Sequence, residues 1–265
     1  MGAQMARDDI PRPTPVNAVE VLSRRLAAAD SIAARIALIE QEISGRIVFS
    51  TSLSLEDQVI LHAIAASGAK VDVFTLDSGR HFPETLETIA ASESRYGIRI
   101  KVIAPDAVDL EQLVARDGIN GFRTSVKARV ACCGVRKVQP LRRTLAGASA
   151  WITGLRQGQS GERRAVTFAT VDSEFNLLKF SPLADWSFAH LEAYVAQERI
   201  PINPLHALGF LSIGCQPCTR AVLPGEDIRA GRWWWENENA KECGLHTQAG
   251  DPVVEPIVTP SGRAA

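Results

Sequence analysis

The sequence predicts an α/β protein built on a mostly parallel sheet. Three short apolar segments rich in β-branched and aromatic residues lie at 46–50, 71–76 and 98–103, and helical spacing separates them at 55–66 and 83–96. Strands that alternate with helices in this way form parallel sheets flanked by helices. Such sheets bind ligands beyond the carboxyl ends of their strands, so we expect the functional residues there.

Length and charge limit the class of protein further. At 265 residues, of which 46% are hydrophobic, the chain can bury one substantial core. A net charge of −1 provides no positive field, so neither nucleic acid nor a membrane surface is an expected partner. The opening residues lack the apolar run of a signal peptide, and no apolar run has the length of a membrane span. We expect a cytoplasmic protein, and a homo-oligomer stays open.

The chain is expected to divide into three parts. Residues 1–16 carry three prolines and form a flexible lead-in. Residues 17–205 form the α/β domain, which begins with an amphipathic helix over 17–43, where leucine, isoleucine and alanine recur every three or four positions. Residues 206–265 form a C-terminal segment, rich in proline and glycine, that folds back over the ligand edge of the sheet.

The second half of the α/β domain has weaker signals. A helical stretch is expected around 135–145, and a fourth strand over 150–153. Two further short apolar runs, at 167–171 and 177–180, are predicted to pair as an added hairpin.

The strongest chemical signal is the pair Cys132-Cys133 followed by Cys215-x-x-Cys218. A CxxC turn can point two thiolates at one metal centre, and the adjacent pair supplies two more. Four thiolates suit an iron–sulfur cluster or a zinc ion. Adjacent cysteines favour the cluster modestly, because structural zinc sites more often use two spaced pairs. From spacing alone, zinc and ordinary buried thiols stay open.

The fifth cysteine, Cys243, stands apart near the C-terminus. Lys241 and His246 flank it and would favour the thiolate, the form that attacks sulfur. Taken alone, a mobile nucleophile and a spare buried cysteine are equally good interpretations.

Polar residues follow the first two predicted strands. Ser52, Ser54 and Asp57 come after the first, and the segment 77–80, Asp-Ser-Gly-Arg, after the second. Hydroxyls, backbone amides and a helix N-terminus can receive an anion or a ribose there. Ser54 is equally typical of a helix cap, which is the more common role of this pattern.

Several cations lie near these segments, and guanidinium groups grip phosphate and sulfate oxygens in pairs. For any single one of them, a solvated surface position is the more common role. These clustered cations are Lys137, Arg156, Arg163, Arg164, Arg229 and Arg232. The tryptophans at 233–235 either stack on a base or pack in the core, and core packing is the more common role.

Five motifs together resemble the assimilatory adenylyl-sulfate reductases, within the family that also contains the 3′-phosphoadenylyl-sulfate reductases. They are TLDSGRHFPET at 75–85, the cysteine pair, the CxxC, RWWWE at 232–236 and ECGLH at 242–246. The resemblance extends from about residue 46 to 250 and implies an adenine-nucleotide α-hydrolase-like fold of the pyrophosphatase-loop type. Residues 52–57, SLSLED, replace the glycine-rich loop of those pyrophosphatases, which argues against ATP cleavage.

The resemblance implies that adenosine 5′-phosphosulfate is reduced to sulfite and AMP in sulfate assimilation, and so in cysteine biosynthesis, with thioredoxin as electron donor. Cys243 would be the nucleophile and would form an S-sulfonate. The implied ligands of a [4Fe–4S] cluster are Cys132, Cys133, Cys215 and Cys218. The implied substrate-binding residues are Ser52, Ser54, Asp57, Lys137 and Arg164 in the nucleotide-binding domain, and Arg229 and Arg232 in the C-terminal segment.

Three alternatives follow from the same residues. The nearest is reduction of 3′-phosphoadenosine 5′-phosphosulfate. The second is an ATP-dependent adenylating enzyme, such as one that thiolates RNA. The third is a zinc-stabilised binding module, in which Cys243 would be dispensable.

Overall fold

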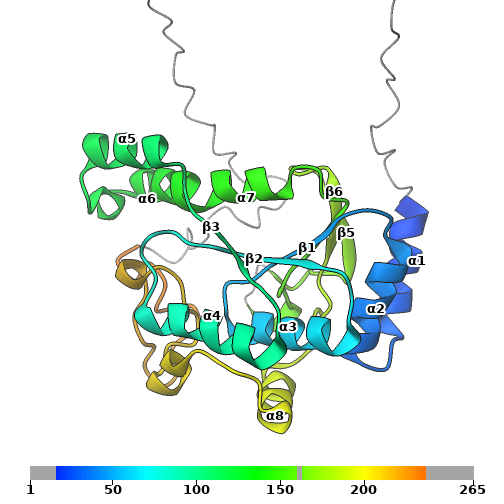
Figure 1. The fold of residues 1–265 in the computed structure, drawn as a ribbon. Helices are drawn as coiled ribbons and strands as arrows, with labels where there is room; N and C mark the ends of the chain where they lie inside the picture. The colour runs from blue at the N-terminus through cyan, green and yellow to red at the C-terminus, as the bar shows by residue number, and fades with distance from the viewer. Residues whose placement is uncertain (1–15, 160–162, 237–265) are drawn as a thin grey trace, which may run out of the picture.

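A six-stranded sheet forms the centre of the protein (Figure 1). The computed structural model describes residues 16–159 and 163–236. The strands lie in the order β3-β2-β1-β4-β6-β5, and all neighbours are parallel except β5 and β6. Their bounds are β1 Ile47–Ser50, β2 Asp72–Leu76, β3 Lys101–Ile103, β4 Ala150–Ile152, β5 Ala169–Asp172 and β6 Leu177–Phe180. The predicted fold class, a mostly parallel sheet flanked by helices, is confirmed.

Helices cover both faces of this sheet. In Figure 1, α5, α6 and α7 lie on one side, and α3, α4 and α8 on the other, with α1 and α2 beside the latter group. Their bounds are α1 Val16–Ala27, α2 Ile32–Glu42, α3 Leu55–Ser67, α4 Pro83–Tyr96, α5 Ala107–Asp117, α6 Val126–Cys133, α7 Gln139–Leu145 and α8 Phe188–Glu198. No helix in the described part of the chain is long and apolar enough to cross a membrane.

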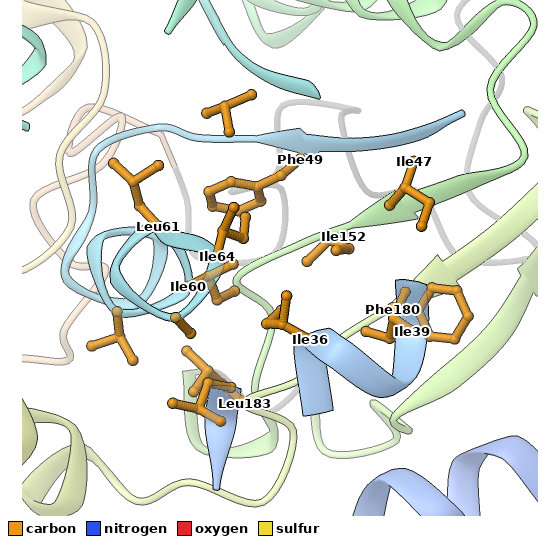
Figure 2. Close-up of a cluster of buried hydrophobic side chains, with 14 of the residues drawn as sticks. Ile36, Ile39, Ile47, Phe49, Ile60, Leu61, Ile64, Ile152, Phe180 and Leu183 are labelled. Carbon is orange, nitrogen blue, oxygen red and sulfur yellow. The ribbon is translucent and has the colours of Figure 1, made fainter. Parts of the chain in front are cut away.

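The alternation of side chains along the central strands produces two cores. Ile47 and Phe49 of β1 pack with α2 and α3 in the larger core, shown in Figure 2. Val48, between them, points to the other face and joins Leu141 and Leu145 of α7. Successive residues of a strand face opposite sides, so a strand covered on both faces is apolar throughout. Truncation of the fully buried Phe49 to alanine is expected to cost about 3–5 kcal/mol.

The strand order identifies the ligand edge. From β1 the sheet grows through β2 to β3 in one direction, and through β4 to β6 in the other. Connections therefore diverge between β1 and β4, and the crevice beyond their carboxyl ends is where open α/β sheets bind ligands.

The structure differs from the predicted elements in three places. The helix predicted over 17–43 is two helices, because Ser31 caps α2 by accepting a hydrogen bond from the Ala34 amide at 3.1 Å. The helix predicted around 135–145 begins earlier, since α6 continues through a π-helical turn, Gly134–Val138, into α7. Helices α5 and α8 were not predicted. The hairpin of β5 and β6 is confirmed.

Candidate active site

The carboxyl ends of β1, β2 and β4 open into one pocket, with an empty volume of about 1330 Å³. We call it the polar pocket. Polar residues at the end of each of these strands, or in the loop that follows it, line the wall, and residues of the segment 211–233 close the other side. The C-terminal segment, as far as it is described, thus lies over the ligand edge as predicted. Six candidate residues meet in this pocket: Ser52, Ser54, Asp57, Lys137, Arg229 and Arg232.

Ser52 and Ser54 shape the turn between β1 and α3. Ser54 is the N-cap of α3, and its hydroxyl accepts a hydrogen bond from the Asp57 amide at 3.4 Å. Ser52 donates from both its amide and its hydroxyl to Oδ2 of Asp57, each at 2.6 Å. The loop after β4 approaches so closely that a side chain at Gly154 would collide with Oδ1 of Asp57. These contacts hold the Asp57 carboxyl in one position in the pocket wall.

Burial raises the pKa of Asp57 from its ordinary value of 3.8 to about 6, although the hydrogen bonds from Ser52 lower it. The neighbouring carboxylate of Glu56 raises it further. Glu56 is itself paired with the buried Arg156, at 2.9 Å. A carboxyl that takes up a proton near pH 6 repels an anionic ligand less than an ordinary aspartate would.

Four cationic side chains line the pocket. Lys137, Arg229 and Arg232 were predicted, and Arg163, whose guanidinium donates to Oε1 of Gln159 at 2.7 Å, is the fourth. Arg164 is exposed and does not line the pocket in the described part of the chain. This excess of positive charge suits a ligand with several anionic oxygens.

Lys137 belongs to two cavities at once. It lies in the π-helical turn between α6 and α7, a distortion that often occurs at functional sites. Its side chain lines the polar pocket and also a smaller cavity behind it. Cys215 and Trp233 line both cavities as well, so these three residues form a shared wall.

All four cysteines of the predicted cluster line the smaller cavity, which has an empty volume of about 340 Å³. We call it the cysteine cavity. Cys132 and Cys133 end α6, while Cys215 precedes and Cys218 ends a 3₁₀ turn, Gln216–Cys218. The other lining residues are cationic or aromatic: Arg80, Phe122, Arg129, Arg136, Lys137 and Trp233.

The thiols of the cysteine cavity differ in their electrostatic environment. Burial raises the pKa of Cys215, but Lys137, a 3.1 Å contact with the Ser78 hydroxyl and Arg232 outweigh burial, and the pKa is lowered overall. Burial and the neighbouring Cys215 raise the pKa of Cys218 to about 11. The cations thus favour the thiolate at the cysteine nearest the polar pocket.

The RWWWE sequence packs directly on the CxxC turn. The Trp233 amide donates to the Cys218 carbonyl at 3.1 Å, and Thr219 and Arg232 form an antiparallel bridge. Trp233 has a φ of 41°, in the left-handed region that costs a large residue about 1–3 kcal/mol. The surrounding contacts hold this backbone, and the indole is only 1% exposed. The core-packing interpretation of Trp233 is therefore correct, although the ring also borders the pocket.

The donor set of the cysteine cavity fits a thiolate-ligated cluster. Four thiols line one small cavity, and the nearby cations would offset the negative charge of such a group. Among the described residues, no three or more His, Cys, Asp or Glu side chains are grouped so that they could hold a single metal ion. Cys243 lies outside the described residues.

Known proteins identify the family. Residues 46–221 match the phosphoadenosine phosphosulfate reductase domain. The chain belongs to the phosphoadenosine phosphosulfate reductase family. Its fold is also similar to the crystal structure of a phosphoadenylyl-sulfate reductase from Candida auris in a phosphate complex, with a TM-score of 0.67 and 24% sequence identity over 79% of this chain and 98% of that one.

Two relatives within this phosphoadenosine phosphosulfate reductase family carry the name adenosine 5′-phosphosulfate reductase. The protein from Sinorhizobium fredii is 54% identical over 227 residues, which is 86% of this chain and 90% of the relative. The protein from Agrobacterium fabrum is 51% identical over 236 residues, which is 89% of this chain and 90% of the relative.

Several residues that line the polar pocket were not predicted from the sequence. Arg163 was noted only as a cation, and His81 only as part of a motif, yet both line the pocket. The Nε2 atom of His81 lies 2.9 Å from the Leu76 carbonyl, and burial lowers the pKa of this imidazole, although that hydrogen bond and Asp77 raise it. Thr153, the last residue of the strand predicted over 150–153, and Gly154, directly after it, could have been found from that position.

Proposed function

We propose that the protein reduces adenosine 5′-phosphosulfate to sulfite and AMP in sulfate assimilation, with Cys243 as nucleophile and thioredoxin as electron donor. Relatives that share half of its residues over most of their length are named for this substrate, which supports an oxidoreductase acting on a sulfur group. The observation that carries the proposal is the polar pocket, in which Lys137, Arg229 and Arg232 surround the space beyond β1 and β4.

The cations of the pocket would bind the phosphosulfate. Guanidinium and ammonium donors stabilise the negative charge that builds up on the phosphate when a sulfur–oxygen bond breaks. The hydroxyls at the carboxyl ends of β1, β2 and β4 would hold the nucleoside at the ligand edge. Arg164, exposed beside Arg163, stays a candidate for the same anion.

The reaction proposed for Cys243 has two stages. Its thiolate attacks the sulfur of the phosphosulfate, the bond from sulfur to the bridging oxygen breaks, and AMP leaves with the electron pair, so that Cys243 carries an S-sulfonate. A thiolate of thioredoxin then attacks the Cys243 sulfur and sulfite leaves with the bonding pair. The second thioredoxin thiol resolves the mixed disulfide, so the dithiol supplies both electrons.

We further propose that Cys132, Cys133, Cys215 and Cys218 hold a [4Fe–4S] cluster. Bound there, the group would supply fixed charge beside Lys137 and stabilise the wall between the two cavities. The thioredoxin dithiol accounts for the electrons of the reaction, so no step requires the cluster to carry them.

The decisive experiment is sulfite release by anaerobically purified protein with reduced thioredoxin. Adenosine 5′-phosphosulfate and its 3′-phosphorylated form are supplied at equal concentration in separate and competing reactions. Preference for the first supports the proposal. Preference for the second changes the substrate, and no sulfite from either, in protein of confirmed iron content, would refute it.

The nucleophile is tested by Cys243→Ser. A hydroxyl is a far weaker nucleophile than a thiolate, so we expect sulfite production to fall at least about 10³-fold while iron content and AMP affinity stay unchanged. Intact-mass analysis after mixing with adenosine 5′-phosphosulfate should show the sulfonate adduct on the wild type alone. Normal turnover of the serine variant would contradict the role of Cys243.

A further inference from the structure

A buried ion pair joins the helix of the cysteine pair to the root of the C-terminal segment. Arg129, on α6, lies three positions before Cys132, and Glu236 closes the RWWWE sequence. The Arg129 Nε atom donates to both carboxylate oxygens of Glu236, at 2.8 and 3.0 Å. The two side chains are only 1% and 4% exposed.

Burial distinguishes this pair from the surface ion pairs of the protein. Two buried charges lose their hydration and compensate only through close mutual contact. The Arg220–Glu226 pair, at 2.7 Å in the same C-terminal region, has side chains that are 33% and 29% exposed. Surface pairs of that kind contribute little. A buried pair between distant segments, in contrast, fixes one segment relative to the other.

The Arg129 guanidinium also packs on the strained tryptophan. Its central carbon lies 4.5 Å from the centre of the Trp233 ring, and that of Arg232 lies 4.7 Å from the same centre. Arg232 lines the polar pocket and Trp233 lines both cavities. The Arg129–Glu236 pair is therefore connected to the polar pocket through the Trp233 ring. The Glu236 amide donates to the Trp233 carbonyl at 2.8 Å, which completes the turn.

Chain connectivity relates this turn to Cys243. Cys243 follows Glu236 by seven residues, which span at most about 25 Å when fully extended. The position of Glu236 therefore sets the centre of the region that the Cys243 thiol can reach. An anchor at this point lowers the number of arrangements that a tethered nucleophile must search.

We propose that the Arg129–Glu236 ion pair is a positioning device, which anchors the segment bearing Cys243 to α6 and raises the rate at which its thiol meets the bound substrate. The inference rests on the proposed function in taking Cys243 as the nucleophile. Neither residue lines the polar pocket, so we assign both as positioning residues rather than catalytic ones.

The test is Arg129→Gln in the full-length, iron-loaded protein. Formation of the Cys243 S-sulfonate is followed in a single turnover with saturating adenosine 5′-phosphosulfate and no thioredoxin. We expect the rate to fall about tenfold, because a displaced nucleophile loses orientation, while the Kd for AMP stays within about twofold. Because Arg129 also lines the cysteine cavity, the rate is expressed per iron-loaded protein. A purely structural role would lower the melting temperature but leave this rate intact, and an unchanged rate in folded Arg129→Gln overturns the proposal.

Three further variants keep the test decisive. Arg220→Gln removes a charge from the exposed pair and should leave the rate unchanged. Arg129→Lys keeps the charge without the fork of donors and should recover part of the rate. If Arg129→Gln does not fold, Glu236→Gln removes the same contact from the other side, and a wild-type rate in that variant overturns the proposal.

Failure of the proposed function would be recognised separately, because the wild type itself would then form no S-sulfonate. The anchoring is in that case measured by hydrogen exchange of the backbone at 229–236. Faster exchange in Arg129→Gln than in Arg220→Gln is expected if the pair anchors the segment. Equal exchange in the two variants overturns the anchor irrespective of the chemistry.

Discussion

The polar pocket and the cysteine cavity are neighbours with opposite characters. The pocket is large, lined by hydroxyls, carboxyls and cations, and open at the ligand edge of the sheet. The cysteine cavity has about a quarter of its empty volume and is enclosed by thiols, aromatic rings and arginines. Lys137, Cys215 and Trp233 belong to both.

Because of this difference in lining, the two cavities suit different kinds of ligand. A pocket rich in polar groups at a strand edge suits a charged molecule that enters and leaves with each reaction. A small enclosed set of thiols suits a group that is inserted once and stays. The shared wall means that changes behind it should reach the pocket, and mutations can measure how strongly.

The largest effect is expected from Cys215→Ser. Cys215 is a proposed cluster ligand in the shared wall, so its loss should remove iron and lower turnover at least about 100-fold, since cofactor binding supports folding of the site. Iron and acid-labile sulfide analysis with a sulfite assay measures both. The matched comparison is Cys243→Ser, which should keep its iron. Full iron content and full activity in Cys215→Ser would show that the polar pocket functions independently of the cysteine cavity.

Lys137→Gln should act on the pocket with less effect on the cysteine cavity. Hydrogen bonds to charged groups are worth about 1.5–3 kcal/mol, so kcat/KM is expected to fall about 10-fold to 100-fold with most of the iron retained. Lys127→Gln, at an exposed position on the same helical stretch, is the control and should have no effect. Loss of iron in Lys137→Gln would show that this lysine acts mainly on the cysteine side.

Asp57→Asn tests the electrostatics of the pocket alone. The folded pKa of Asp57 is about 6 and its ordinary value is 3.8, so between these values the folded state binds more protons than the unfolded state. Wild-type stability should therefore fall as pH rises from about 4 to 6. The variant cannot ionise, and at pH 7.5 it should be more stable by up to about 3 kcal/mol, with little difference near pH 4. Thermal unfolding across this range measures the effect, and parallel pH profiles would contradict the raised pKa.

The sequence predicted the sheet well because its strands are buried on both faces. Val48 and Phe49 point to opposite cores, so the whole strand is apolar and easily recognised. The helix over 17–43 was predicted as one because its apolar spacing continues across Ser31, and only the cap shows the break. Helix α5 buries only Leu113, which leaves little apolar pattern to detect.

The residues of the site were predicted better than their arrangement in space. The four cysteines and Lys137 were predicted from residue type and order, and the structure brings them together around the cysteine cavity. Spacing does not show that Arg163 faces the pocket while Arg164 is exposed, because adjacent side chains in an irregular segment have no fixed period. The Arg129–Glu236 pair joins residues more than 100 positions apart, and such a contact is visible only in the fold.

The smallest effect is expected from Ser78→Ala, which probes the back of the shared wall. The Ser78 hydroxyl is fully buried and lies 3.1 Å from the Cys215 sulfur, while the Ser78 carbonyl accepts a hydrogen bond from Arg136 that the alanine variant keeps. Only one weak contact to sulfur is lost, so we expect stability to fall by about 1 kcal/mol and the visible absorption of the iron-loaded protein to shift. Turnover should change less than twofold if the polar pocket responds only to the charge of Lys137. A tenfold loss of turnover with normal iron would instead show that the hydrogen bonding of Cys215 is transmitted into the pocket, and that the two cavities act as one site.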